Sequence, residues 1–315
     1  MRLLFLRGQV PQDRNPREIM HKSLAEEDDV WTHLAHGLGD ERCEVVYWGG
    51  NRCVKYSDKC TIRWVKSLKH YQPDFEPDVV WARGGFDEYR PVLKRSDSAT
   101  KVYYGSGARY RPKDGIRYNL VLCDSDVQLK KVRSTGLNGA LWVKPAVDTM
   151  FYPRDVKKKY DVGYVGDARF AFRARIKMVK VAYTVPENLK MLHLGWSGKY
   201  KVPKNVKVKR VKRWDMPAQI CKCGVIVVPY MAYDSCPRII PEALACGVPV
   251  VALDTVQFWH EKYPVEVVSK ENLWDAVQNV LPTDIRSIYL EQLSMKKATE
   301  MLRHLIGKEK QNSAF

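Results

Sequence analysis

The run from Tyr230 to Asp254, YMAYDSCPRIIPEALACGVPVVALD, constrains the fold more than any other part of the chain. A polar loop at Asp234–Cys236 leads into a short helical pattern, IIPEALAC, which Gly247 ends before a β-rich run begins. Glycine is the residue that most often follows the last turn of a helix. An apolar β pattern, GVIVVPY, precedes the loop, so the order strand, loop, helix, strand predicts an α/β sheet.

In such a sheet the loop and the start of the helix lie at the carboxyl end of the preceding strand. Backbone N–H groups there can bind a diphosphate without a basic side chain. Glu242 lies eight positions after Asp234. Its carboxylate can accept hydrogen bonds from a vicinal diol such as a ribose, and Asp234 can accept those of a second sugar. The spacing therefore indicates a ligand that carries hydroxyls as well as phosphate.

The same run resembles the donor-site signature of retaining nucleotide-sugar glycosyltransferases of the GT-B fold. That signature is an acidic residue, seven positions, Glu, and then Ala-x-Ala-x-Gly-x-Pro-Val. The chain differs where the family usually has Glu, with Asp234, and where it usually has Phe-Gly, with Cys236-Pro237. The residues that carry the resemblance are Asp234, Ser235, Cys236, Pro237, Arg238, Ile239, Ile240, Pro241, Glu242, Ala243, Leu244, Ala245, Gly247, Pro249 and Val250.

The resemblance implies a catalytic role for Asp234 and Glu242, with Asp234 orienting the hydroxyls of the transferred sugar and Glu242 holding the ribose. It implies a nucleotide-sugar as co-substrate, a UDP-sugar in the first instance, and no essential metal or other cofactor. The backbone that would bind the donor's diphosphate comprises Ser235, Cys236, Pro237, Arg238 and Ile239.

A second part of the donor site is expected in KYDVGYVGDARF, a strand that runs into a glycine loop at Gly166. The family has Arg directly after this glycine and a Lys several residues later, and both grip the diphosphate. Here Asp167 stands in place of that Arg. We therefore assign the cationic role to Arg169, Arg173 and Arg175.

Alternating strand and helix patterns predict an α/β protein with two doubly wound, Rossmann-like domains and a cleft between them, as in the GT-B fold. The run ALWVKPAVDTMFYP resembles the linker of that fold. We place an acceptor-binding domain at 1–153, a donor-binding domain at 154–284, and helices that return to the first domain at 285–315.

Loops after the strand patterns at 2–6, 78–85 and 100–107 should lie at one edge of the first sheet, where a ligand is expected. Surface loops without a ligand are an equally good reading of them. The residues assigned to the acceptor side are Gly8, Arg83, Gly84, Asp87, Arg109, Tyr110 and Arg111.

Two local expectations concern the first domain. Residues 51–76 read as a polar connection with a helix around Ile62–His70. Asp126 reads as the N-cap of the helix VQLKKVRS, in preference to a metal-diphosphate ligand paired with Asp124.

Charge is the strongest signal in the composition. The 315 residues carry a net charge of +17, and 18 Lys and Arg against four acids fall between Arg154 and Arg213. A basic face of this size attracts a polyanion, either nucleic acid or anionic lipid headgroups. A solvated face that only aids solubility is the alternative.

We expect DNA to be the acceptor, through the hydroxymethyl group of a modified pyrimidine, as in phage enzymes that glycosylate DNA. A glycolipid or polysaccharide at a membrane surface is the second hypothesis, and a non-catalytic module that binds a nucleotide-sugar or nucleic acid is the third.

The N-terminal run MRLLFLRGQV has too short an apolar stretch for a signal peptide, so a cytoplasmic location is expected, in the host if the chain is phage-encoded. The cysteines show no paired spacing and read as reduced thiols.

Overall fold

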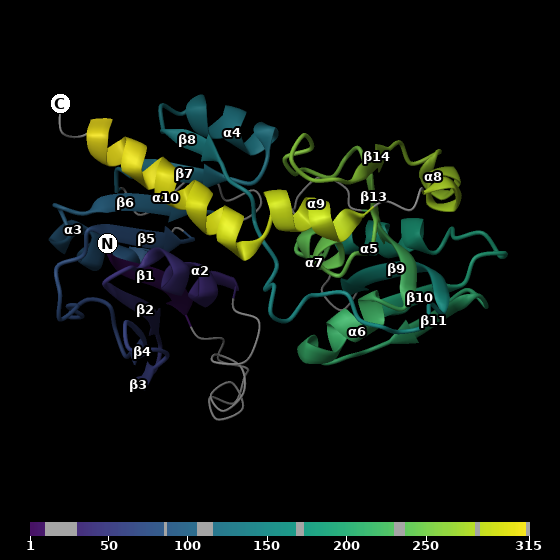
Figure 1. The fold of residues 1–315 in the computed structure, drawn as a ribbon, viewed down its shortest axis with the longest axis horizontal. Coiled ribbons are helices and arrows are strands. Elements are labelled where there is room, and N and C mark those ends of the chain that lie inside the picture. Colours follow the sequence, from purple (N-terminus) through teal and green to yellow (C-terminus); the bar gives the residue numbers. More distant parts are fainter. Residues whose placement is uncertain are drawn as a thin grey trace. The chain divides into compact units, whose positions relative to one another are not determined.

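A computed structural model describes residues 1–9, 30–84, 87–105, 116–167, 173–229, 237–280 and 284–312. The chain divides into two compact units, Met1–Trp142 with Ala298–Phe315, and Val143–Lys297 (Figure 1). The extended residues 143–153, predicted to belong to the first domain, are part of the second unit. The end of the chain belongs to the first unit from Ala298 onward.

The first unit is built on an eight-stranded sheet with the order β3-β4-β2-β1-β5-β6-β7-β8. Neighbouring strands are parallel except for the β3–β4 pair, which is antiparallel. From β4 to β8 this is the doubly wound order, in which the chain steps outward from β1 in one direction and then in the other. The strands are β1 (Arg2–Gln9), β2 (Arg42–Trp48), β3 (Arg52–Lys55), β4 (Cys60–Val65), β5 (Val79–Arg83), β6 (Thr100–Tyr104), β7 (Leu120–Cys123) and β8 (Gly139–Leu141).

The helix expected around Ile62–His70 is wrong, because residues 62–65 belong to β4 and residues 66–70 form no helix. Cys60, Ile62 and Trp64 are buried and the residues between them are partly exposed. That alternation has a period of two, which suits a strand with one covered face and does not suit a helix. β3 pairs with β4 at the edge of the sheet.

Helices cover both faces of this sheet. On one face, Val92 and Leu93 of α3 (Arg90–Arg95) and Val132 of α4 (Asp126–Arg133) pack against Leu4 and Leu6. On the other face lie α2 (Val30–Leu38) and the C-terminal helix α10 (Met295–Asn312). Since both faces are covered, the central strands read as nearly continuous apolar runs.

Two side-chain contacts fix α10 within the first unit. The Nε1 of Trp142 donates to the carbonyl of Ala298 at 3.0 Å. The guanidinium of Arg303 donates to the carbonyl of Gly37 at 2.6 Å, and it also pairs with Asp40.

Ser125, and not Asp126, caps α4. The Ser125 hydroxyl accepts from the N–H of Gln128 at 3.2 Å, and Asp126 is the first helical residue. Both residue types serve as caps or first-turn residues, so the pattern left an uncertainty of one position.

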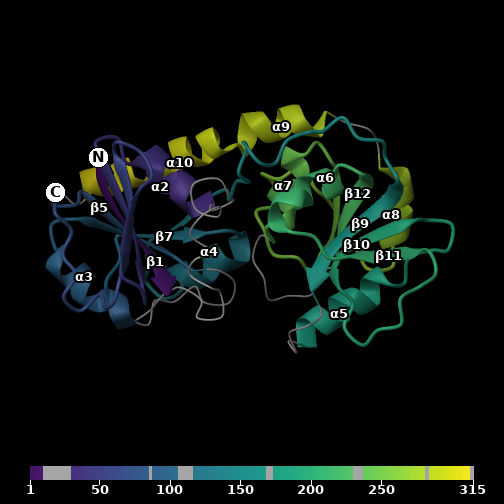
Figure 2. The same ribbon diagram turned by 90° about the horizontal axis from the view of Figure 1, so that it is seen from below.

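The second unit is built on a six-stranded, all-parallel sheet with the order β11-β10-β9-β12-β13-β14. Its helix α5 lies on one face, and α6 and α7 lie on the other (Figure 2). The elements are β9 (Tyr160–Asp167), α5 (Arg173–Ala182), β10 (Met191–Trp196), β11 (Val206–Lys209), the short 3₁₀ helix η2 (Arg213–Asp215), α6 (Met216–Ile220), β12 (Cys223–Val228), α7 (Ile239–Ala245), β13 (Val250–Leu253), β14 (Glu266–Val268), α8 (Leu273–Asn279) and α9 (Ile285–Gln292).

Each sheet has one point at which the strand order reverses, between β1 and β5 in the first unit and between β9 and β12 in the second. Connections leave these neighbouring strands toward opposite faces, so a crevice opens beyond their carboxyl ends. In the second unit the chain passes from β12 to α7, which carries Glu242. The helix that carries Glu242 therefore follows a strand at the reversal point.

Two buried tyrosines tie down the extended residues that open the second unit. Tyr263 accepts from the N–H of Lys144 at 2.8 Å and donates to its carbonyl at 3.0 Å. Tyr289 accepts from the N–H of Ala146 at 3.1 Å and donates to Asp148 Oδ1 at 2.6 Å. These bonds satisfy backbone groups that would otherwise be buried without partners.

No helix within the described residues is both long enough and apolar enough to cross a membrane.

Candidate functional site

Glu242 is buried and is bound by two arginines. Its side chain lies on α7 with an exposed fraction of 5%. Arg213, from η2 on the connection between β11 and β12, donates from Nη1 to Oε2 at 3.0 Å and from Nη2 to Oε1. Arg238 Nε lies 3.3 Å from Oε1. The planar fork of one arginine thus engages both oxygens, which fixes the orientation of the carboxylate.

The carboxylate of Glu242 can accept hydrogen bonds from a further ligand. A carboxylate offers about four acceptor positions, and the two arginines do not use all of them. With two guanidinium groups and one carboxylate, the cluster carries one net positive charge. Arg213 also stacks over Phe151, its Cζ 4.7 Å from the ring centroid. A hydroxyl-bearing anion suits such a cluster better than a cation does.

Pro237 and Arg238 directly precede α7, which begins at Ile239. Ile239 is buried, whereas the side chain of Arg238 is 51% exposed. The first N–H groups of a helix have no partner within the helix. At the far end of α7, the N–H of Gly247 bonds to Leu244 and φ of Gly247 is +70°, as expected of the residue that ends a helix.

Gly166 lies near the carboxyl end of β9, at the reversal point of the sheet. A Cβ at this position would overlap the side chain of Tyr164, so any larger residue would displace that buried ring. The Gly166 carbonyl is 2.8 Å from Nε2 of His193, and because a carbonyl only accepts, Nε2 must be the donor. The other ring nitrogen, Nδ1, lies 2.8 Å from the Tyr183 hydroxyl. His193 therefore holds the carbonyl of Gly166 in place near the end of β9.

His193 and Arg213 are missing from the sequence-based site. His193 is the one polar residue in the buried strand pattern MLHLG, and it is fully buried. That contrast was a usable signal, because a buried polar side chain needs a partner. Arg213 gave no comparable signal, since it is one of many basic residues in its stretch.

Several predicted donor residues lie outside the description. They are Asp234, Ser235, Cys236 and Arg169, and the side chains of Arg173 and Arg175, whose backbone forms the first turn of α5.

In the first unit, Arg83 and Gly84 lie at the carboxyl end of β5, beside the reversal point. The Arg83 guanidinium lies 4.9 Å from the ring centroid of Trp31, and its buried Nε has no hydrogen-bond partner among the described residues. Gly84, with φ of +82°, donates its N–H to the carbonyl of Tyr104 at 2.8 Å.

The other acceptor-side residues are less closely grouped. Gly8 lies in the last part of β1, opposite Tyr47 of β2. Asp87 opens the short 3₁₀ helix η1 (Asp87–Tyr89), which is anchored by a bond from the Tyr89 hydroxyl to the carbonyl of Arg83 at 2.9 Å. Arg109, Tyr110 and Arg111 lie outside the described residues.

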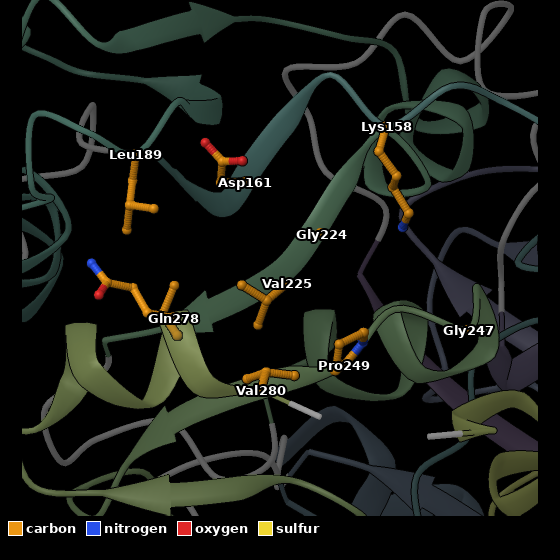
Figure 3. Close-up of a pocket in the computed structure, with 10 residues that line it drawn as sticks. Lys158, Asp161, Leu189, Gly224, Val225, Gly247, Pro249, Gln278 and Val280 are labelled. Atoms are coloured by element: carbon orange, nitrogen blue, oxygen red, sulfur yellow. The ribbon is translucent and has the colours of Figure 1, made fainter. Parts of the chain in front are cut away.

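A cavity of about 500 Å³ lies at the amino ends of the strands of the second sheet (Figure 3). Asp161 and Gly224 border it from the amino ends of β9 and β12, and Pro249 borders it just before β13. Ligands of doubly wound sheets bind beyond the carboxyl ends of the strands. This cavity is therefore separate from the site around Glu242.

The described part of the chain contains no group of three or more His, Cys, Asp or Glu side chains that could hold a metal ion. Of its seven cysteines, which are all free thiols, only Cys53 is exposed.

No family model matches the chain, and no curated protein matches it. Several solved structures are similar to the chain in fold. Sucrose-phosphate synthase from Thermosynechococcus elongatus superimposes with a TM-score of 0.68 at 12% identity, covering 100% of both chains. HepE from Anabaena in complex with UDP-glucose gives a TM-score of 0.66 at 12% identity, covering 98% of this chain and 100% of HepE.

The lipopolysaccharide outer core galactosyltransferase WaaB gives a TM-score of 0.64 at 13% identity, covering 98% of this chain and 100% of WaaB. These proteins share an architecture of two Rossmann-like domains. The chain has the GT-B fold. In this fold the second unit, with Glu242 and Gly166 at its reversal point, corresponds to the C-terminal domain, and this confirms the fold class predicted from the sequence.

Proposed function

We propose that the chain is a glycosyltransferase that moves a sugar from a nucleotide-sugar to an acceptor hydroxyl with retention of anomeric configuration. The observation that carries the proposal is the position of Glu242. It is a buried carboxylate on the helix that follows the strand at the reversal point, within a run that resembles a donor-site signature. The likeness to HepE, which was solved with UDP-glucose, supports a UDP-sugar as the donor.

The difficult step is breakage of the bond between the anomeric carbon and the diphosphate oxygen. Negative charge grows on the departing diphosphate while the sugar becomes oxocarbenium-like. The backbone N–H groups of Cys236, Arg238 and Ile239 and the guanidinium of Arg238 would stabilise that charge, because preorganised donors stabilise developing anions strongly. Arg169, Arg173 and Arg175 would add positive charge from the glycine loop and α5.

Retention follows if the acceptor oxygen attacks from the face that the diphosphate leaves. The acceptor's proton then passes to the leaving diphosphate, so no carboxylate nucleophile is required. Asp234 would orient the sugar hydroxyls. Glu242 would accept hydrogen bonds from the ribose with the capacity that Arg213 leaves unused, and Arg213 would hold it in position.

We propose DNA as the acceptor, through a hydroxymethylated pyrimidine, because the charge of the chain is +17 and the basic residues are concentrated between Arg154 and Arg213. The likeness to WaaB favours a second candidate, a glycolipid or polysaccharide at a membrane surface.

Sugar transfer from radiolabelled UDP-sugars tests the proposal, with hydroxymethylated DNA, unmodified DNA and lipid extract as parallel acceptors. Label in hydroxymethylated DNA alone is the expected result. Label only in lipid would replace the DNA acceptor with the second candidate. Label in no fraction, together with full donor binding, would indicate a binding module. Asp234→Ala and Glu242→Ala should each abolish transfer.

A further inference from the structure

The connection from β10 through β11 to η2 carries a dense basic surface. It consists of Lys199, Lys201, Lys207, Lys209, Arg210 and Lys212, all of them exposed. No acidic residue occurs between positions 188 and 214. We refer to these six residues as the basic surface.

Most of these residues lie near the carboxyl ends of the strands of the second sheet. β11 is the outermost strand, and its register with β10 pairs Lys209 with Leu194. The carboxyl ends of β10 and β11 therefore lie side by side. Lys199 follows the first of these ends closely, and Arg210 and Lys212 follow the second.

Two exposed tryptophans accompany the basic surface. Trp196, the last residue of β10, is 41% exposed, and Trp214 of η2 is 42% exposed. Lys212 Nζ lies 5.0 Å from the centroid of the Trp214 ring. Exposed aromatic rings interleaved with cations are typical of surfaces on which the bases of a single strand stack while its phosphates bind the cations.

The basic surface continues directly into the candidate donor site. Arg213, which precedes Trp214, turns inward and holds Glu242, whereas Trp214 remains exposed. The short helix η2 thus directs Arg213 toward α7 and leaves the ring of Trp214 exposed to solvent.

We propose that the basic surface, together with Trp214, binds the sugar-phosphate backbone of a single-stranded stretch of DNA. This rests on the proposed function, because it makes the surface the acceptor-docking part of the same enzyme. It assigns acceptor binding to residues of the second unit.

Two alternative explanations of the basic surface account for fewer of its residues. Lysines on an edge strand prevent pairing with another sheet, but Lys199, Lys201, Arg210 and Lys212 lie outside β11. A membrane-binding surface is commonly an amphipathic helix with a broad apolar face. Here the cations stand on a four-residue strand and on connecting segments.

The test is fluorescence anisotropy with a dye-labelled single-stranded oligonucleotide that has no modified base, measured over a series of salt concentrations. The variant Lys207→Gln/Lys209→Gln/Arg210→Gln should bind about tenfold or more weakly. Its slope of log affinity against log salt should be smaller by about two, since each phosphate contact on a single strand contributes about 0.7. Trp214→Ala should bind about tenfold more weakly with an unchanged slope.

A matched control removes three exposed lysines from the first unit, Lys94→Gln/Lys130→Gln/Lys131→Gln, and should keep the wild-type slope. Equal slopes for the two triple variants would overturn the proposal. Binding of the wild type to phosphatidylglycerol vesicles but not to the oligonucleotide would also overturn it.

Calorimetry with UDP on the same proteins separates this inference from the proposed function. The triple variants should bind UDP like the wild type. If no protein binds UDP but the oligonucleotide results are as expected, the docking surface stands and the transferase proposal fails.

Discussion

Arg213 engages both carboxylate oxygens of Glu242, and the two residues come from different elements of the second unit. Arg213 belongs to η2, on the long connection from β11 to β12, and Glu242 belongs to α7, which follows β12. The ion pair therefore joins the crossover to the helix of the candidate donor site. A buried carboxylate without its partner is strongly unfavourable, so this pair has consequences that can be measured.

Arg213→Ala should destabilise the second unit. Removing one partner of a buried ion pair costs about 3 kcal/mol or more, and Arg238 offsets part of this. Denaturant unfolding measures the change. In a Glu242→Gln background the same substitution should cost much less, because no buried charge is left behind. Equal costs in both backgrounds would contradict the pairing.

Arg238→Ala should weaken binding of UDP by about tenfold and leave binding of uridine unchanged. Its side chain is 51% exposed at the start of α7, where a diphosphate is proposed to bind. Calorimetry with the two ligands checks this. A parallel loss for uridine would indicate that Arg238 supports the fold of the site and does not contact the diphosphate. Lys270→Ala, at an exposed position after β14, serves as the charge-matched control.

Tyr289→Phe should destabilise the protein by about 1 to 3 kcal/mol, the usual cost of leaving a buried donor without its acceptor. The fully buried hydroxyl accepts from the N–H of Ala146 and donates to Asp148. Tyr152→Phe, at a side chain that is 42% exposed, should have little effect. The comparison is again by denaturant unfolding, and similar losses for the two variants would be inconsistent with this network.

His36 should make the first unit less stable in mild acid. Burial and then the nearby charges of Lys59 and His33 lower the pKa of His36 below its ordinary value of 6.5. The unfolded chain therefore takes up a proton before the folded chain does, so stability is complete above pH 6.5 and falls as the pH drops below it. His36→Gln should reduce this fall in denaturant midpoint. An unchanged pH dependence in the variant would show that other groups cause the loss.

The doubly wound sheets were predictable where burial on both faces produces apolar strands, as in β5 and β12, and where Gly247 ends α7. β4 was missed because it lies near an edge of its sheet and alternates buried with polar residues. Glu242 could be named from its spacing to Asp234. Its partner Arg213 could not, because the pairing spans 29 positions and depends on how the crossover packs.

In the first unit, too, contacts between residues far apart in the sequence could not be predicted. Loops after parallel strands could be assigned to one edge of the sheet from the alternation of elements alone. The contact between Arg83 and Trp31 joins β5 to α2, two elements far apart in sequence, and only the folded chain reveals it.

The proposed position of the nucleotide-sugar can be checked in a crystal structure with UDP bound. We expect the diphosphate against the backbone at Arg238 and Ile239, with the ribose hydroxyls hydrogen-bonded to Glu242. UDP in the cavity of about 500 Å³ at the amino ends of β9 and β12, with Glu242 still bound only to its arginines, would contradict it.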